Sequence, residues 1–329
     1  PILCEDALAS KSSDQLVTVF GGSGFIGQHV ARALQTRSRP IRLATRRPLL
    51  PDTEEEVVSL QGTGQRPEDW RKAVDGCDAI VHLAARAHVL KEYAIDPLAA
   101  FREANLQLSL ACAQAAMDAG TRRFVFVSSI GVHGNQTDGK PFNVHDALAP
   151  RSPYARSKME AELELKALCR NTEMELVVVR PPLVYGPRAP GNFASLMQAL
   201  LRGIPLPLGA VTANRRSFVA LDNLIDLLIT CIDHPAAANQ TFLISDGEDL
   251  STTDLLRRLG QAMNKPARLL PVPPSLLQFG ANLLGKGDMA QRLLGSLQVD
   301  IGHTRNTLNW TPPISVDEGL RRAVAGLAP

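Results

Sequence analysis

The chain has 329 residues, of which 45% are hydrophobic and 21% are charged, and its formal net charge is +2. This composition excludes a disordered or collagen-like chain. The charge balance gives no electrostatic case for a nucleic-acid partner or for an anionic membrane surface. At about 150 residues per domain, the length predicts roughly two domains.

Short β-rich runs alternate with helical stretches through the first half of the chain. The pattern predicts strands at residues 16–20, 41–45, 79–83, 124–127 and 176–179, and helices at 25–37, 68–74, 97–119 and 153–170. Continuous apolar strands separated by helices predict an α/β fold with a Rossmann-type, doubly wound parallel sheet.

The sequence pattern changes after Val184, where prolines become frequent and the alternation of strands and helices weakens. We therefore expect a dinucleotide-binding domain over residues 1–184, completed by about 218–247. Residues 185–217 and 248–329 are expected to form a smaller C-terminal substrate domain.

The cysteines and the N-terminal residues bear on the cellular compartment. Five widely spaced cysteines include no C-x-x-C, which favours reduced thiols over a zinc site or a disulfide framework. No H-x-x-x-H pair is present, so no metal site is predicted. The first fifteen residues lack the pattern of a signal peptide, and no apolar run is long enough to span a membrane. We expect a cytoplasmic protein without membrane insertion.

A glycine-rich turn joins the first predicted strand to the first predicted helix. The candidate cofactor residues of this turn are Gly21, Ser23, Gly24, Phe25, Ile26 and Gly27. Glycine permits the tight turn, the approach of a pyrophosphate to the backbone and close packing of the helix, whose free N–H groups then bind the phosphates. The turn therefore predicts dinucleotide binding.

The end of the second predicted strand bears on the choice of dinucleotide. An NAD site usually has an acidic residue there, but this chain continues with Thr45, Arg46 and Arg47. A guanidinium group suits the 2′-phosphate of NADP(H), which is therefore favoured, although NAD(H) stays open.

Ser129, Tyr154 and Lys158 are the candidate catalytic residues. Ser129 follows a strand at the edge where open α/β sheets bind ligands. Tyr154 and Lys158 form Y-x-x-x-K, which places them on one helix face, and a nearby ammonium would lower the pKa of the phenol. This set predicts proton transfer at a carbinol oxygen while a nicotinamide transfers the hydride.

Together these motifs resemble the extended short-chain dehydrogenase/reductases, the family of UDP-galactose 4-epimerase. The resemblance extends from Leu16 to about Ala325 and includes an asparagine of the long helix, Asn105. It implies further cofactor contacts at Leu83, Ala84, Ala85, Pro181, Leu183 and Val184. It also implies that Asn192, Phe193 and Arg216 bind the nucleotide of a UDP-sugar substrate.

Local motifs around Arg86, Pro182 and Pro207 are most similar to bacterial 4-reductases of UDP-4-keto-6-deoxy-N-acetylhexosamines, which serve surface polysaccharide synthesis. Arg86, His88 and His133 follow strand ends and are candidates to face the sugar, although such residues are more often structural.

Three functions from two classes remain open at this point. The first is an NADPH-dependent reductase of a UDP-4-keto sugar, and the second is a UDP-hexose 4-epimerase that keeps NAD bound. The third is a cofactor-binding structural subunit without turnover. Members of the family often form homodimers, and the helices that begin at Pro97 and Pro153 are the candidates for such an interface.

Overall fold

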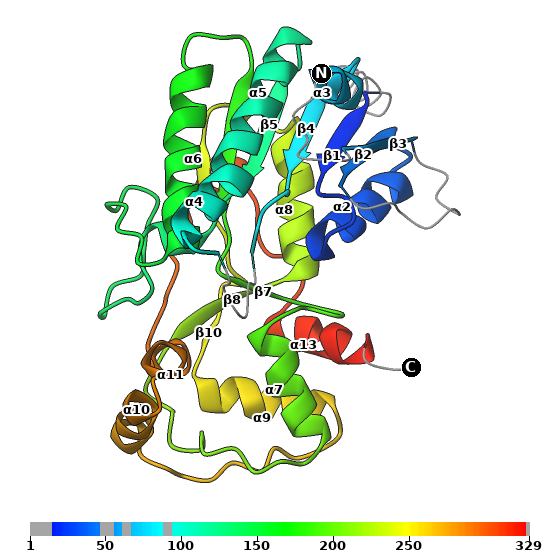
Figure 1. Ribbon diagram of the computed structural model, residues 1–329. Coiled ribbons are helices and arrows are strands. Elements are labelled where there is room, and N and C mark those ends of the chain that lie inside the picture. The colour runs from blue at the N-terminus through cyan, green and yellow to red at the C-terminus, as the bar shows by residue number, and fades with distance from the viewer. Residues whose placement is uncertain (1–14, 47–55, 61–66, 88–93, 327–329) are drawn as a thin grey trace.

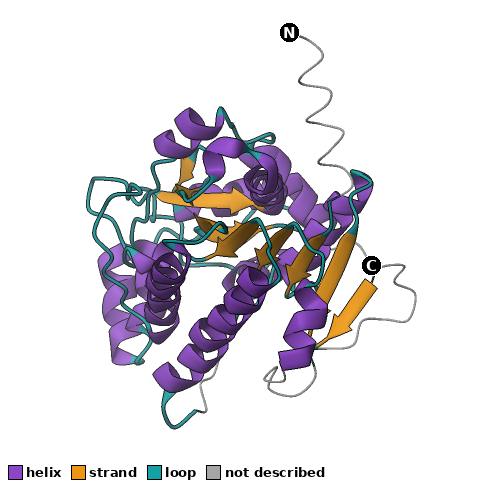
Figure 2. Ribbon diagram, turned by 90° about the horizontal axis from the view of Figure 1, so that it is seen from above, coloured by secondary structure: helices purple, strands orange, loops and turns teal. Residues whose placement is uncertain are grey.

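The computed structural model describes residues 15–46, 56–60, 67–87 and 94–326, and its centre is a seven-stranded parallel sheet (Figures 1 and 2). The strand order is β3-β2-β1-β4-β5-β6-β9, and every pairing between neighbours is parallel. The strands are β1 (Val17–Phe20), β2 (Ile41–Thr45), β3 (Glu56–Ser59), β4 (Ala79–His82), β5 (Arg123–Val127), β6 (Glu175–Arg180) and β9 (Thr241–Leu243). The predicted doubly wound fold is thereby confirmed.

Helices cover both faces of this sheet, which explains why its central strands are apolar without alternation. Every residue of β1, β2, β4 and β5 is buried. One face packs against α2 (Phe25–Thr36) and α8 (Leu221–Asp233), and the other packs against α3 (Pro67–Val74), α5 (Leu108–Asp118) and α6 (Pro153–Cys169). The edge strand β3 was not predicted, because it is short and largely exposed.

The predicted helix at 97–119 is interrupted by a π-helical turn. It consists of α4 (Pro97–Arg102), the π turn η1 (Glu103–Gln107) and α5 in direct succession. Asn105 lies in the π turn and is fully buried. Such turns often occur at functional sites, because the extra residue changes which side chain faces the core.

The remaining elements form a smaller body at the lower end of Figure 1. A three-stranded sheet contains β7 (Leu183–Tyr185), β8 (Arg216–Ala220) and β10 (Asp249–Leu250). The helices of this body are α7 (Asn192–Leu201), α9 (Thr252–Ala262), α10 (Pro274–Leu283), α11 (Gly287–Leu294) and α13 (Val316–Ala325). The short helix α12 (Gly302–Leu308) instead contacts β9 at the edge of the parallel sheet.

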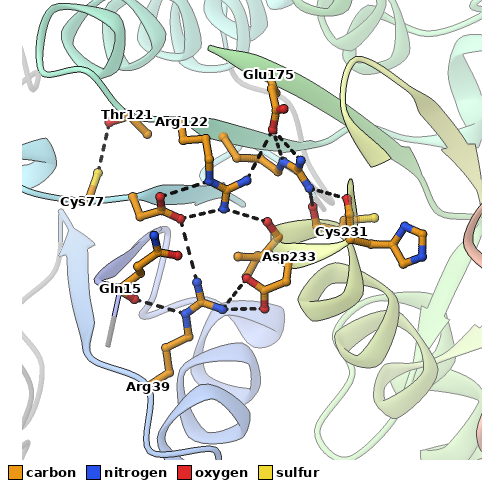
Figure 3. Close-up of polar contacts among 12 residues, drawn as sticks. Gln15, Arg39, Cys77, Thr121, Arg122, Glu175, Cys231 and Asp233 are labelled. Carbon is orange, nitrogen blue, oxygen red and sulfur yellow. Dashed lines mark hydrogen bonds and ion pairs between the residues drawn. The ribbon is translucent and has the colours of Figure 1, made fainter. Parts of the chain in front are cut away.

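Two buried arginines hold α8 at the amino ends of the parallel strands (Figure 3). Arg39 donates from Nη1 to both carboxylate oxygens of Asp233 at 2.7 and 2.6 Å. Arg123 donates to the backbone oxygen of Cys231 at 3.0 Å and also pairs with Glu175. Cations at the carbonyl end of a helix are favourable. These contacts therefore hold the segment containing α8 and β9 at the edge of the sheet that lies opposite the glycine turn.

Candidate active site

The carboxyl ends of the parallel strands bring the predicted site segments together. Since all seven strands run in one direction, the residues that follow β1, β4, β5 and β6 meet at one edge of the sheet. Backbone hydrogen bonds continue the pairing there, from the Leu83 nitrogen to the Phe20 oxygen at 2.9 Å and from the Ser128 nitrogen to the Val179 oxygen at 2.7 Å. The segments 21–27, 83–86, 128–129 and 181–184 therefore share one edge.

The glycine turn has the geometry that a dinucleotide requires. Gly21 has a φ of +83°, and a Cβ on it would lie 2.8 Å from the backbone nitrogen of Ala84. A Cβ on Gly27 would lie 2.2 Å from the carbonyl oxygen of Gly21. No side chain caps the start of α2 at Gly24, so its first N–H groups are available to an anion. The turn therefore fits a pyrophosphate held at the positive end of α2, with Ser23, Phe25 and Ile26 supplying the backbone around it.

The end of β2 presents a cation and no acid. Thr45 is buried and its carbonyl oxygen accepts a hydrogen bond from the Leu60 nitrogen at 2.8 Å, whereas the next residue, Arg46, is exposed. Arg47 lies outside the described residues. The exposed guanidinium of Arg46 suits a phosphate on the adenosine ribose better than a free hydroxyl.

Ser129 and Tyr154 form the polar centre of the site. Tyr154 lies in the first turn of α6, which Ser152 caps by accepting from the Ala155 nitrogen at 3.2 Å. The Ser129 Oγ accepts from the Gly131 nitrogen at 3.1 Å, which leaves its proton for the Tyr154 oxygen. Burial raises the pKa of Tyr154 to about 12, and the hydrogen bond with Ser129 opposes that rise. The phenol is therefore held in its protonated form.

Lys158 follows Tyr154 by one helical turn but does not act on it as predicted. Its side chain is buried, and its Nζ lies 3.9 Å from the ring centroid of Phe126. Burial lowers the pKa of Lys158 to about 7, and the carboxylate of Glu162 partly opposes this. The prediction that a nearby ammonium lowers the pKa of Tyr154 is wrong for this arrangement, because the ammonium lies over Phe126 and burial of the phenol dominates.

Asn105 connects the loop after β4 to the catalytic helix. Its Oδ1 accepts from the Arg86 nitrogen at 2.7 Å, and its Nδ2 donates to the Ser157 Oγ at 3.0 Å. Ser157 in turn donates to the carbonyl oxygen of Tyr154 at 2.8 Å. The Arg86 guanidinium lies 5.4 Å from the ring centroid of Phe101, whose edge contacts the Tyr154 ring. Arg86 is thus placed one side chain away from Tyr154.

Arg216 lies at the start of β8 beside a second cation that the sequence analysis missed. Its Nη1 donates to the Gly295 oxygen at 3.0 Å. Burial and, to a smaller extent, the positive charge of Arg292 together lower the pKa of Arg216 to about 10. Among the described carboxylates, none forms an ion pair with either guanidinium. Two converging cations of this kind suit a diphosphate. No local signal in the sequence pairs residues that are so far apart along the chain.

A short strand-like segment links this pair to the region of Ser129 and Tyr154. Leu297 bridges to Arg216 through the backbone and packs in one cluster with Ile130, the residue after Ser129. The arginine pair and the Ser129–Tyr154 pair therefore flank the same segment.

Other residues that were predicted to contact a ligand are either buried or have side chains outside the described residues. Phe193 is 2% exposed and packs on Tyr185 in the core of the smaller body, with ring centroids 5.5 Å apart. Asn192 begins α7, but its side chain lies outside the described residues, as does His88. His133 is buried, with its Nε2 2.8 Å from Arg180.

The loop after β6 lies at the carboxyl edge of the sheet, and its residues differ in solvent exposure. Pro181 is buried, Leu183 is 38% exposed, and Val184 packs against the core of the first domain. Ala84 and Ala85 lie beside the glycine turn and are half-buried.

Comparison with known proteins gives consistent matches over nearly the whole chain. The model of the NAD dependent epimerase/dehydratase family matches residues 17–245. A UDP-glucose 4-epimerase of Vibrio cholerae is 42% identical over 307 residues, which cover 93% of each chain. The solved UDP-N-acetylglucosamine 4-epimerase of Methanobrevibacter ruminantium, in complex with UDP-N-acetylmuramic acid, has a TM-score of 0.78 at 21% identity and covers 95% of this chain and 98% of its own. The UDP-glucose 4-epimerase of Thermotoga maritima with UDP-glucose has a TM-score of 0.76 at 21% identity, with the same coverage.

Proposed function

This chain belongs to the NAD dependent epimerase/dehydratase family, and from that premise we propose that it is an oxidoreductase acting at C4 of a UDP-linked sugar. Its proposed reaction is the NADPH-dependent reduction of a UDP-4-keto-6-deoxy-N-acetylhexosamine. The observation that carries this proposal is the Tyr154 phenol placed beside Ser129 at the carboxyl edge of the sheet. Reduction of a ketone requires a proton donor at this place.

The site residues have separate roles in the proposed reaction. A bound nicotinamide dinucleotide supplies the hydride. Tyr154 gives its proton to the C4 oxygen, and Ser129 hydrogen-bonds the same oxygen and orients it. The glycine turn holds the pyrophosphate of the dinucleotide, and Arg46 pairs with its 2′-phosphate. Arg216 and Arg292 hold the diphosphate of the UDP-sugar, so that the sugar ring extends towards Tyr154.

A second function, UDP-hexose 4-epimerase, is favoured by the Vibrio cholerae relative. An epimerase must first remove a proton from the C4 hydroxyl, which requires a phenolate. It must also return the hydride to the same sugar and therefore keeps NAD bound. The lack of an acid at the end of β2 favours the reductase over this alternative.

Cofactor release and exchange distinguish these functions. The purified protein is denatured, any released nicotinamide is identified, and the cofactor-free form is titrated with NADPH and NADH. The reductase is expected to bind NADPH more tightly, and Arg46→Asp is expected to reverse the preference. Stoichiometric NAD that resists exchange would overturn the reductase in favour of the epimerase. Binding of neither dinucleotide would overturn both enzymatic functions.

A further inference from the structure

One short stretch of the smaller body carries an unusual share of exposed apolar side chains. Among the described residues, ten large hydrophobic side chains are exposed, and half of them lie in residues 265–287, which we call the outer segment. These five are Leu270, Leu276, Phe279, Leu283 and Leu284, with exposures of 51% to 73%. Figure 1 shows the outer segment, which includes α10, at the end of the molecule far from the seven-stranded sheet. Such a concentration marks an interaction surface.

The α10 helix exposes three of its large apolar side chains, whereas Leu277 packs against the core of the smaller body. Leu276, Phe279 and Leu283 recur at helical spacing and share one exposed face, and none of the residues of α10 is buried. Gln278 and Asn282 instead line a polar cavity beside α11. A surface helix normally buries its apolar face and exposes its amides. The exposed apolar face of α10 is therefore the side that meets a partner.

The charge of the outer segment identifies the kind of partner. It contains Lys265, Arg268 and Lys286 and no aspartate or glutamate, so its net charge is +3 in a chain whose total is +2. All three cations are exposed, and none forms an ion pair with a described carboxylate. The even balance of the whole chain conceals this local excess, which suits an anionic surface.

We propose that the outer segment docks on an anionic lipid bilayer, with α10 in the plane of the interface and its apolar face among the acyl chains. Apolar side chains flanked by lysine and arginine are the combination that interfacial helices use. No described helix is long and apolar enough to cross a membrane, so the contact lies on the surface. A second copy fits less well, because a two-fold interface would place this acid-free segment against itself and leave its cations unpaired.

The docked face lies next to the proposed diphosphate site. The α11 helix follows the outer segment directly and ends at Gly295, whose carbonyl oxygen accepts from Arg216. The catalytic residues lie beyond Arg216, at the sheet edge. Docking through α10 therefore leaves the Ser129–Tyr154 pair untouched, and turnover of a soluble substrate is independent of it.

Vesicle co-sedimentation of the full chain tests the apolar part of the proposal. The probes are phosphatidylcholine vesicles and vesicles in which about a third of the lipid is phosphatidylglycerol. We expect binding to the second kind, and we expect the double variant Phe279→Ser/Leu283→Ser to lose it by at least about tenfold. The matched control is Leu163→Gln, which changes a leucine that is 51% exposed on α6 and should bind like the wild type. Unchanged unfolding temperatures show that the variants are folded.

The same protein and vesicles test the role of the three cations and the alternative partner, which is a second copy of the chain. Neutralising Lys265, Arg268 and Lys286 to glutamine is expected to weaken binding by about a hundredfold, and high salt should do the same. The proposal would be overturned if the wild-type protein bound to neither kind of vesicle. Dimers that dissociate in the Phe279→Ser/Leu283→Ser variant would also overturn it, since the apolar face would then belong to a second copy.

Discussion

Arg180 and Glu162 form an ion pair that is withdrawn from solvent behind the catalytic helix. The Arg180 Nε donates to the two carboxylate oxygens at 3.0 and 3.1 Å, and the side chains are 3% and 0% exposed. Glu162 follows Lys158 by one turn of α6, and its negative charge raises the pKa of that lysine. Arg180 thus holds the anion that partly opposes the lowering of the Lys158 pKa by burial.

Removing this anion is expected to affect both stability and the state of Lys158. Glu162→Gln leaves Arg180 buried without an opposite charge, which should cost about 3–5 kcal/mol of unfolding free energy. The pKa of Lys158 should fall below about 7. Denaturant unfolding measures the first effect, and the pH profile of turnover reports the second. The control is Glu160→Gln on the same helix, whose partner Arg102 is 41% exposed and whose loss should cost less than about 1 kcal/mol. Equal losses in the two variants would contradict this account.

Lys158 itself should make the protein less stable at neutral pH than it is in alkali. Its pKa is about 7 in the folded protein and 10.5 ordinarily. Between these values the unfolded chain binds more protons, so this group adds stability as the pH rises from about 7 to about 10. Lys158→Met should be more stable at pH 7 and should lack this rise. Unfolding free energies of the two proteins are compared across that range, and parallel curves would show that the lysine does not titrate in this way.

Tyr154→Phe tests the proton donor. Without the phenol proton, turnover should fall by about 100- to 10,000-fold, because that is the usual contribution of general acid catalysis. Dinucleotide binding should persist, since the glycine turn is unchanged, and is measured by titration. Ser129→Ala is the companion variant, and it should raise the pKa of Tyr154 further because the opposing hydrogen bond is lost. Unchanged biological activity of Tyr154→Phe, with no turnover in either protein, would favour the structural subunit.

Gly27→Ala tests the close approach of α2 to the glycine turn. The new Cβ would lie 2.2 Å from the Gly21 oxygen, so α2 must shift. We expect a loss of about 1–3 kcal/mol in unfolding free energy and weaker dinucleotide binding. Gly280→Ala in α10 is the control, because nothing lies within 4 Å of its added Cβ. That change should stabilise the protein by up to about 1 kcal/mol. Thermal unfolding with and without dinucleotide measures both.

Arg216→Gln and Arg292→Gln test the diphosphate site. Each should weaken binding of UDP by at least about tenfold, because a charge-assisted contact to a phosphate is lost. Calorimetric titration with UDP gives the affinities. The neighbouring Arg215→Gln serves as the control, since Arg215 is exposed and donates to backbone oxygens instead. A site elsewhere is indicated if the control loses as much affinity as the two variants.

The parallel sheet and its covering helices were largely predictable, because their signals are local. Uninterrupted apolar runs such as 124–127 and 176–179 are typical of strands that are covered on both faces. Proline and serine at the start of α6 mark its first turn. The short strands β7 to β10 and the π turn at Asn105 carry no comparable signal, because they depend on partners distant in the sequence.

The sequence by itself determined the parallel sheet, the glycine turn and the helical spacing of Tyr154 and Lys158, since strand burial, turn conformation and helix periodicity are properties of neighbouring residues. Tertiary structure alone decided that the Lys158 ammonium lies over Phe126, that Arg292 stands beside Arg216, and that α10 exposes its apolar face. These features arise from contacts between segments far apart in the chain. Burial and charge at such contacts depend on packing, which no local pattern records.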